Sequence, residues 1–200
     1  MRRFVVNTVI AACLTGGLVI GAAEPLVPAI AQQIDVPHVT QQHSEWCWAA
    51  DASAVLSYRG ASSTQCGIAN WVNSIGYACT SAPFDWNDSA NSPDTLTGTT
   101  GISGILWSLG RRDSRYYDGA ISFGLAMRSI DQREPIVVLW TWPNGGGHFI
   151  VVDGYDKRNQ ALYFMNPWPG EGAGYGDYTW MLGGTGNMGT HTWAESLIVY

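Results

Sequence analysis

A cysteine between two tryptophans, in the run Trp46-Cys47-Trp48, is the residue of this chain best placed to act as a nucleophile. The alanine-rich segment after it carries apolar residues at helical spacing, and Gly60 ends this pattern. Cys47 is therefore predicted at the N-terminus of a helix. Unpaired backbone N–H groups and the helix dipole favour a thiolate there, and the thiolate is the reactive form of a cysteine.

A base for this thiol is predicted at His148. Three glycines, residues 145–147, precede it, and the apolar run 149–152 that follows is typical of a buried strand. Glycines allow another segment to approach the imidazole closely. The other three histidines, His38, His43 and His191, are expected to make surface or polar contacts.

A group that orients this base is predicted at Asn166, at the end of a second strand-like run over residues 161–165. The segment between the two runs, 153–160, is rich in turn-forming residues, so the two strands are expected to be antiparallel neighbours. Asn166 would then lie beside His148. Its amide oxygen is expected to accept the Nδ1–H of the imidazole, which directs Nε2 to the sulfur.

Two further polar positions bear on the chemistry of Cys47. Gln41 lies six residues before Cys47, and its side-chain amide is expected to bind the oxyanion of a tetrahedral intermediate. The neighbouring Gln42 is the alternative donor. Asp51 lies one helical turn after Cys47. We expect its carboxylate to point away from the sulfur or to be paired, because a facing carboxylate raises the pKa of a thiol.

The chain order of these residues resembles that of the papain-like cysteine peptidases. The doubled tryptophans around Cys47 and the short chain are closer to the bacterial secreted and effector-type branch. The matching blocks are Gln41, Cys47-Trp48-Ala49, Gly147-His148 and Asn166-Pro167-Trp168, and the resemblance spans roughly residues 36–200. It implies Cys47 as nucleophile, His148 as general base and acid, Asn166 as orienter, Gln41 as oxyanion donor and Trp168 as a shield of the His–Asn hydrogen bond.

The elements that must position these residues follow in the order helices first, strands afterwards. Besides the helix after Cys47, short helices are predicted within residues 67–78, 105–109 and 121–130, and strands at 135–140, 149–152, 161–165, 175–180 and 191–200. Residues 81–104, which are rich in small polar residues, are expected to form a surface loop. This order predicts an α+β fold. The resemblance implies an N-terminal helical half, with Cys47 at a helix N-terminus, packed against a C-terminal antiparallel β-sheet half.

The first residues have the pattern of an export signal. Arg2 and Arg3 are followed by an uncharged apolar stretch, residues 4–23, and Ala29-Ile30-Ala31 offers a cleavage site, with cleavage after Ala23 as the alternative. A single-pass membrane anchor is the competing interpretation, which the glycines and the cleavage site disfavour. We expect residues 1–31 to be removed and residues 32–200 to form one secreted, monomeric peptidase domain.

Charge and cysteine content limit the partners. The chain has a formal net charge of −6, which disfavours nucleic acids and, after signal removal, an anionic membrane surface. Of the cysteines beyond the signal, Cys66 and Cys79 are expected to form a disulfide in an oxidising compartment, which leaves Cys47 free. The cysteine and histidine spacings match no zinc site, so neither a metal nor a cofactor is predicted.

These observations predict a secreted cysteine peptidase that hydrolyses peptide or protein substrates through an acyl-enzyme thioester. A cell-wall amidase or endopeptidase, or an acyl transferase, would use the same Cys–His chemistry and stays open. A catalytically silent binding module on the same scaffold is the alternative from another functional class. The aromatic segment Trp140-Thr141-Trp142-Pro143 is expected to line the cleft.

Overall fold

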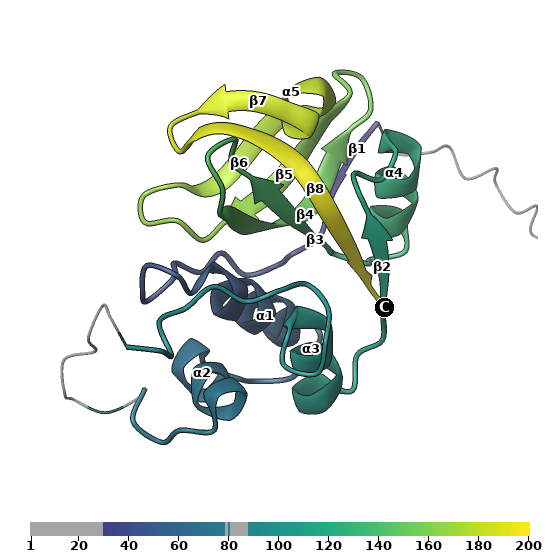
Figure 1. Cartoon of the computed structure of the whole chain (residues 1–200). Coiled ribbons are helices and arrows are strands. Elements are labelled where there is room, and N and C mark those ends of the chain that lie inside the picture. Colours follow the sequence, from purple (N-terminus) through teal and green to yellow (C-terminus); the bar gives the residue numbers. More distant parts are fainter. Residues whose placement is uncertain (1–29, 79, 81–87) are drawn as a thin grey trace, which may run out of the picture.

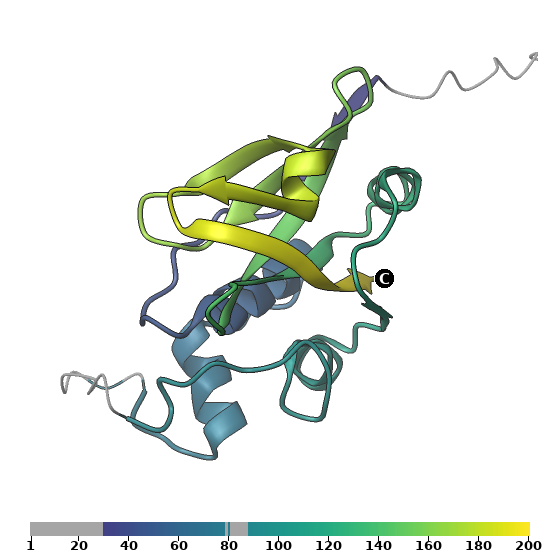
Figure 2. The same ribbon diagram turned by 45° about the horizontal axis from the view of Figure 1, so that its top comes forward.

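The helices within residues 47–110 lie together on one side of an antiparallel sheet, and the helices within residues 123–182 lie against the strands of the sheet half (Figures 1 and 2). The structure, a computed structural model, describes residues 30–78, 80 and 88–200. The helices are α1 (Cys47–Tyr58), α2 (Gln65–Asn73), α3 (Ile102–Gly110), α4 (Phe123–Asp131) and α5 (Tyr178–Leu182). The strands are β1 (Ala31–Gln33), β2 (Ser114–Asp118), β3 (Ile136–Thr141), β4 (Gly147–Asp156), β5 (Ala161–Asn166), β6 (Gly172–Asp177), β7 (Gly183–Gly186) and β8 (Gly189–Val199). The predicted α+β class, with helices before the sheet, is confirmed.

Helix α1 is the centre of the helical half. It contacts α2, α3 and strand β4, and most of its residues are buried. Small side chains such as Ala49, Ala52 and Ala54 are fully buried, and they let the neighbouring elements approach the helix backbone closely. The helix begins at Cys47, as the sequence predicts. The thiol is therefore fixed by the most deeply packed helix of the fold.

The sheet brings the second half of the site together. Its strand order is β2-β8-β3-β4-β5-β6, with β1 paired to β4 and β7 paired to β8, all antiparallel. Strands β3 and β4 place Trp140 opposite His148, and β4 and β5 place Val151 opposite Met165. Asn166 is the residue after Met165, so the pairing carries it toward the level of His148. The predicted antiparallel neighbourhood of these two strands is confirmed.

Some elements differ from the sequence prediction. Residues 175–180 do not form one strand, because β6 ends at Asp177 and α5 begins at Tyr178. The carboxylate of Asp177 accepts a hydrogen bond of 2.9 Å from the backbone N–H of Trp180 and thereby caps the short helix. Helix α3 begins at Ile102, inside the stretch predicted as loop, and the short strands β1, β2 and β7 were not predicted. Residues 81–87 of that loop lie outside the described residues.

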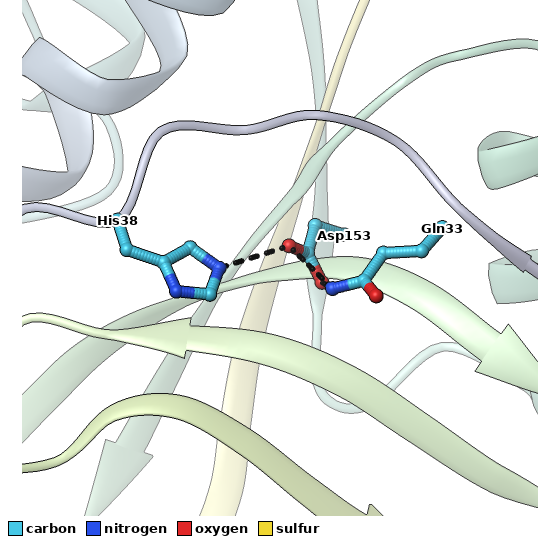
Figure 3. Close-up of polar contacts among 3 residues, drawn as sticks. All are labelled: Gln33, His38 and Asp153. Atoms are coloured by element: carbon cyan, nitrogen blue, oxygen red, sulfur yellow. Dashed lines mark hydrogen bonds and ion pairs between the residues drawn. The ribbon is translucent and has the colours of Figure 1, made fainter.

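The segment before α1 is tied to strand β4 at Asp153 (Figure 3). The side-chain amide of Gln33 donates to both carboxylate oxygens of Asp153 at 3.2 Å, and His38 Nε2 lies 3.6 Å from the same carboxylate. Asp153 is 1% exposed, and burial raises the pKa of its carboxyl group. His38 makes the polar contact expected of it, and its contact fixes the path of the chain toward α1.

The described helices are all too short or too polar to cross a lipid bilayer.

Candidate active site

Cys47 and His148 line one cleft between the helical half and the sheet half. The cleft has a volume of about 580 Å³. One wall comes from Ser44, Glu45 and Cys47 at the start of α1. The other comes from the loop and strand around His148 and from the segments that hold Trp168 and Met188. The expected position of Trp142 at this cleft is confirmed. The two residues predicted to react are thus brought together from opposite halves of the fold.

The thiol of Cys47 is free and buried, with 7% of the residue exposed. Burial raises the pKa of the thiol to about 12. Backbone N–H groups of Phe149 and Trp48 hydrogen-bond to the sulfur and lower its pKa, while the charges of Asp51 and Glu45 raise it. The balance keeps the thiol protonated at neutral pH. The thiolate expected from the helix terminus is therefore not the resting form, because the cost of burying the charge exceeds the help from the helix end.

His148 is held by Asn166 through one ring nitrogen. His148 Nε2 lies 2.8 Å from Asn166 Oδ1, in a buried contact between β4 and the end of β5. Because an amide oxygen only accepts, Nε2 carries the hydrogen and Nδ1 is left as the acceptor of the neutral ring. The prediction that Nδ1 bonds to Asn166 and that Nε2 points to the sulfur was wrong. The backbone N–H of Phe149 hydrogen-bonds to Cys47 Sγ, so the sulfur lies next to the main chain at His148. Of the two ring nitrogens of His148, Nδ1 is the one closer to that main chain.

The imidazole is buried, and two tryptophan rings pack against it. Trp142 and Trp168 contact it edge-on, with ring centroids 6.2 and 5.9 Å from that of His148. His148 is 3% exposed, and burial lowers its pKa to about 4, although the hydrogen bond to Asn166 raises it. The ring is therefore neutral at neutral pH and can accept a proton at Nδ1.

Asn166 is fixed from three sides. Its Oδ1 accepts from His148 and, at 3.0 Å, from the backbone N–H of Trp168, while its Nδ2 donates to Met188 Sδ at 3.4 Å. The two donors at Oδ1 fix the orientation of the amide, since a flipped side chain would place its NH₂ group against an N–H. Trp168 thus helps to position Asn166 Oδ1 and also covers the imidazole of His148.

Gln41 lies outside the lining of the cleft. Its Nε2 donates to the backbone carbonyls of His43 at 2.9 Å and Ser44 at 2.7 Å, which uses both amide hydrogens. Its backbone N–H donates to Pro167 O at 2.8 Å. In this arrangement Gln41 holds the loop before α1, and its role as oxyanion donor stays a prediction. The backbone N–H of Cys47 is a further candidate donor, because an N–H at the first position of a helix has no acceptor within that helix.

The surroundings of Asp51 differ from those expected from the sequence. Its side chain is completely buried, and both carboxyl oxygens are without a hydrogen-bond partner in the described part of the chain. Burial raises the pKa of Asp51 well above its ordinary value, and its charge raises that of Cys47. The residue is neither paired nor remote from the sulfur. Burial without a partner therefore disfavours the charged form of this carboxyl group.

The tryptophans beside Cys47 hold the segment that follows the predicted disulfide region. Trp46 Nε1 donates to Ala90 O at 2.8 Å, and Trp48 Nε1 donates to Ser92 O at 3.0 Å. Cys79 lies outside the described residues, so the Cys66–Cys79 bond stays a prediction. Within residues 30–78, 80 and 88–200, no group of three or more His, Cys, Asp or Glu side chains is arranged to hold a metal ion.

A model of the Peptidase_C39 like family matches residues 33–185. A C39-like peptidase from Bacillus anthracis has a TM-score of 0.55 and 14% identity, over 84% of this chain and 98% of the other. The peptidase domain of Streptococcus ComA, a bifunctional ABC transporter of a quorum-sensing pathway, has a TM-score of 0.50 and 15% identity, over 82% and 97%. These two structures share the fold of this chain. A search of curated proteins gives no match.

Proposed function

This chain belongs to the Peptidase_C39 like family, and from that premise we propose that it is a cysteine peptidase with Cys47 as nucleophile, His148 as base and Asn166 as orienter. The observation that carries the proposal is the shared cleft. Cys47 and His148 face it from opposite halves of the fold, and a 2.8 Å contact to Asn166 leaves Nδ1 of His148 as the free acceptor.

The Cys47 thiol and the His148 imidazole are both buried and neutral, which suggests how the reaction begins. His148 Nδ1 takes the proton of the Cys47 thiol as the sulfur attacks the carbonyl carbon of the scissile peptide bond. The backbone N–H of Cys47 donates to the oxyanion that forms. Asn166 Oδ1 accepts the Nε2–H of the imidazolium and stabilises its charge. The imidazolium then gives its proton to the leaving nitrogen, and the C–N bond breaks to leave a thioester on Cys47.

Hydrolysis of the thioester completes the cycle. His148 Nδ1 removes a proton from a water molecule as its oxygen attacks the thioester carbonyl, and the proton then returns to the departing sulfur. The product is a carboxylic acid, and the free thiol is restored. Trp168 and Trp142 cover the imidazole during these steps and limit the access of bulk water to its hydrogen bond with Asn166.

Substitution of the three residues tests this assignment. We expect Cys47→Ala and His148→Ala to lower kcat/KM on a peptide library by roughly 10⁴-fold or more, as is typical for members of a catalytic unit. Asn166→Ala should keep part of the rate, since His148 remains as the base. Asp118→Asn, which changes an exposed side chain on β2 outside the cleft, is the control and should retain activity. Wild-type turnover in Cys47→Ala would refute the nucleophile.

Covalent labelling gives a second test of the same site. An epoxysuccinyl inhibitor of thiol peptidases should label the wild-type protein, and peptide mapping should find the label on Cys47. Labelling should be lost in His148→Ala, because the buried thiol then has no base. A label on any residue other than Cys47 would contradict the proposal.

Export of the chain is also part of the proposal, supported by the Arg2-Arg3 start and the apolar stretch after it. Cleavage after Ala31 would remove the first residue of β1, which pairs with Asp156, whereas cleavage after Ala23 would keep the whole strand. N-terminal sequencing of protein recovered from the medium distinguishes the two sites. Recovery of the intact chain only in the membrane fraction would contradict secretion.

A further inference from the structure

A second cavity opens beside the cleft on the side of the sheet. We call it the aromatic pocket and define it by Trp140, Trp142, Phe164, Tyr175 and Trp180, the five large aromatic side chains in its lining. Its volume is about 240 Å³, which is enough for one large amino-acid side chain. These rings come from β3, the loop after it, β5, β6 and α5. No single stretch of the sequence forms this pocket.

The rings of the aromatic pocket are fixed by their neighbours. Trp140 and Trp180 meet edge-on with centroids 5.5 Å apart, and His191 stacks on Trp140 at 4.1 Å. A Cβ atom at Gly174 would lie 2.2 Å from the ring of Phe164, and one at Gly184 would lie 2.2 Å from Trp180. The glycines of β6 and β7 thus leave room for the rings. Their positions are set before any ligand binds.

The aromatic pocket is continuous with the cleft of Cys47. Trp142, Glu171, Asn187 and Met188 line both cavities. Asn166 lines the aromatic pocket, whereas Cys47 and His148 line only the cleft. In the proposed reaction His148 Nδ1 gives its proton to the leaving nitrogen, so the leaving segment begins beside His148 and we infer that it continues past the imidazole toward Asn166. The aromatic pocket lies in that direction, next to Asn166.

Charge favours a cation in this pocket. Glu171 lies at its border with the cleft, and Glu45 lines the cleft as well. Among the described residues that line the two cavities, none is Lys or Arg. Asn187 Nδ2 donates to Glu171 Oε1 at 3.3 Å and holds the carboxylate at the border. Faces of tryptophan and tyrosine attract cations, and the attraction strengthens where water is excluded.

We propose that the aromatic pocket binds an Arg or Lys side chain of the substrate on the leaving-group side of the scissile bond. The inference rests on the proposed peptidase function, because the leaving-group side is defined by the reaction. One feature favours a neutral competitor. Trp140 Nε1 is buried without an acceptor in the described part of the chain, and the carbonyl oxygen of a citrulline side chain would provide one. Substrates that carry Arg or citrulline therefore distinguish a pocket for a cation from a pocket for a neutral acceptor.

Matched peptide pairs test the inference by cleavage. Quenched fluorescent peptides carry Arg or citrulline, and Lys or norleucine, at successive positions on the leaving-group side. At one position we expect kcat/KM to be about tenfold higher for the charged member of each pair. Glu171→Gln and Trp180→Leu should each reduce this preference. Asp118→Asn, which removes an exposed carboxylate from the opposite edge strand β2, should leave it unchanged. Equal kcat/KM within the pairs at every position would overturn the inference.

A binding measurement separates this inference from the proposed function. The Cys47→Ala variant is titrated with N-acetyl-arginine methylamide and with its citrulline analogue, and the indole N–H signals of the tryptophans are followed by NMR. We expect the arginine compound to bind about tenfold more tightly and to shift signals that are lost in Trp180→Leu. If no peptide is cleaved in a Cys47-dependent way, the peptidase proposal fails, and binding alone then decides whether the pocket takes a cation. Binding of the arginine compound no tighter than that of citrulline would overturn the inference.

Discussion

Cys47 and His148 are both shielded from water, with 7% and 3% of each residue exposed. Burial raises the pKa of the thiol to about 12 and lowers that of the imidazole to about 4. Both effects have the same physical cause, which is that a charge loses its hydration when it is buried. The free protein therefore holds a neutral thiol and a neutral imidazole, and the charged pair forms during the attack on the substrate.

This protonation state predicts the pH dependence of activity. His148 must be neutral to accept a proton, so kcat/KM should be constant near neutral pH and fall as the pH drops through about 4. The rate of iodoacetamide alkylation of Cys47 should rise continuously with pH while the protein stays folded, because its pKa is about 12. A plateau of alkylation near neutral pH would reveal a preformed thiolate and contradict this assignment.

Asp51 gives a prediction about stability. Its pKa in the folded protein lies well above the value of about 3.9 in an unfolded chain, so between these two values the unfolded chain has lost a proton that the folded chain keeps. Stability therefore falls as the pH rises through this window. Asp51→Asn should remove the slope and raise the free energy of unfolding at neutral pH relative to the wild type, with little gain near pH 4.

Urea denaturation at several pH values measures this effect. Asp118→Asn is the control. This substitution also removes one carboxylate, but from an exposed position on β2. Parallel stability profiles for Asp51→Asn and the wild type would show that Asp51 ionises in the folded protein at its ordinary pKa.

At the scale of elements, two glycines in helices of equal length have opposite surroundings. Gly104 lies within α3, where an added Cβ would be 2.1 Å from Thr99 O and 2.4 Å from Gly98 O. Gly124 lies within α4, where an added Cβ would meet no atom within 4 Å. Backbone oxygens cannot move aside cheaply, so the loop before α3 requires glycine at position 104.

The two sites predict opposite outcomes for the same substitution. Gly104→Ala should destabilise the protein by about 1–3 kcal/mol, as overpacking does. Gly124→Ala should stabilise it by roughly 0.5–1 kcal/mol, because alanine has the higher helix propensity. Thermal and chemical denaturation of the two variants measure the difference. Equal stability of both variants would mean that residues 98 and 99 yield without cost.

At the scale of the whole molecule, the C-terminal end of α1 is tied to the last strand of the sheet. The guanidinium of Arg59, which follows α1, donates to Val199 O at the end of β8. Tyr58 OH donates to Arg133 O, which lies between α4 and β3, at 3.1 Å. These contacts join segments that are far apart in the chain. They fix α1, and with it Cys47, relative to the sheet that carries His148.

The predicted disulfide also acts at this scale. A bond between Cys66 and Cys79 should stabilise the folded chain by roughly 3 kcal/mol, because it closes a short loop in the unfolded state. Peptide mapping without reduction should find these two residues linked and Cys47 as a free thiol. Cys66→Ser combined with Cys79→Ser should lower the melting temperature and leave the cleft intact. Cys47 found in a disulfide in active protein would contradict the pairing.

The sequence by itself determined the features that depend on local periodicity and chain order. The apolar spacing after Cys47 predicted α1 and its first residue, and the runs around His148 and before Asn166 predicted two antiparallel strands. The succession of helices and strands predicted the α+β class. These features follow from nearest neighbours along the chain, since helical and extended segments are recognised by which residues recur on one face.

Only the tertiary structure decided how the side chains meet. The nitrogen of His148 that contacts Asn166, the two carbonyls that occupy Gln41 and the burial of Asp51 depend on segments far apart in sequence. The aromatic pocket likewise needs five rings from separate elements. Burial reverses the charge states that local sequence suggests for Cys47. Hydration of a charge depends on every segment that packs around it, and that packing is not encoded in any one stretch of the chain.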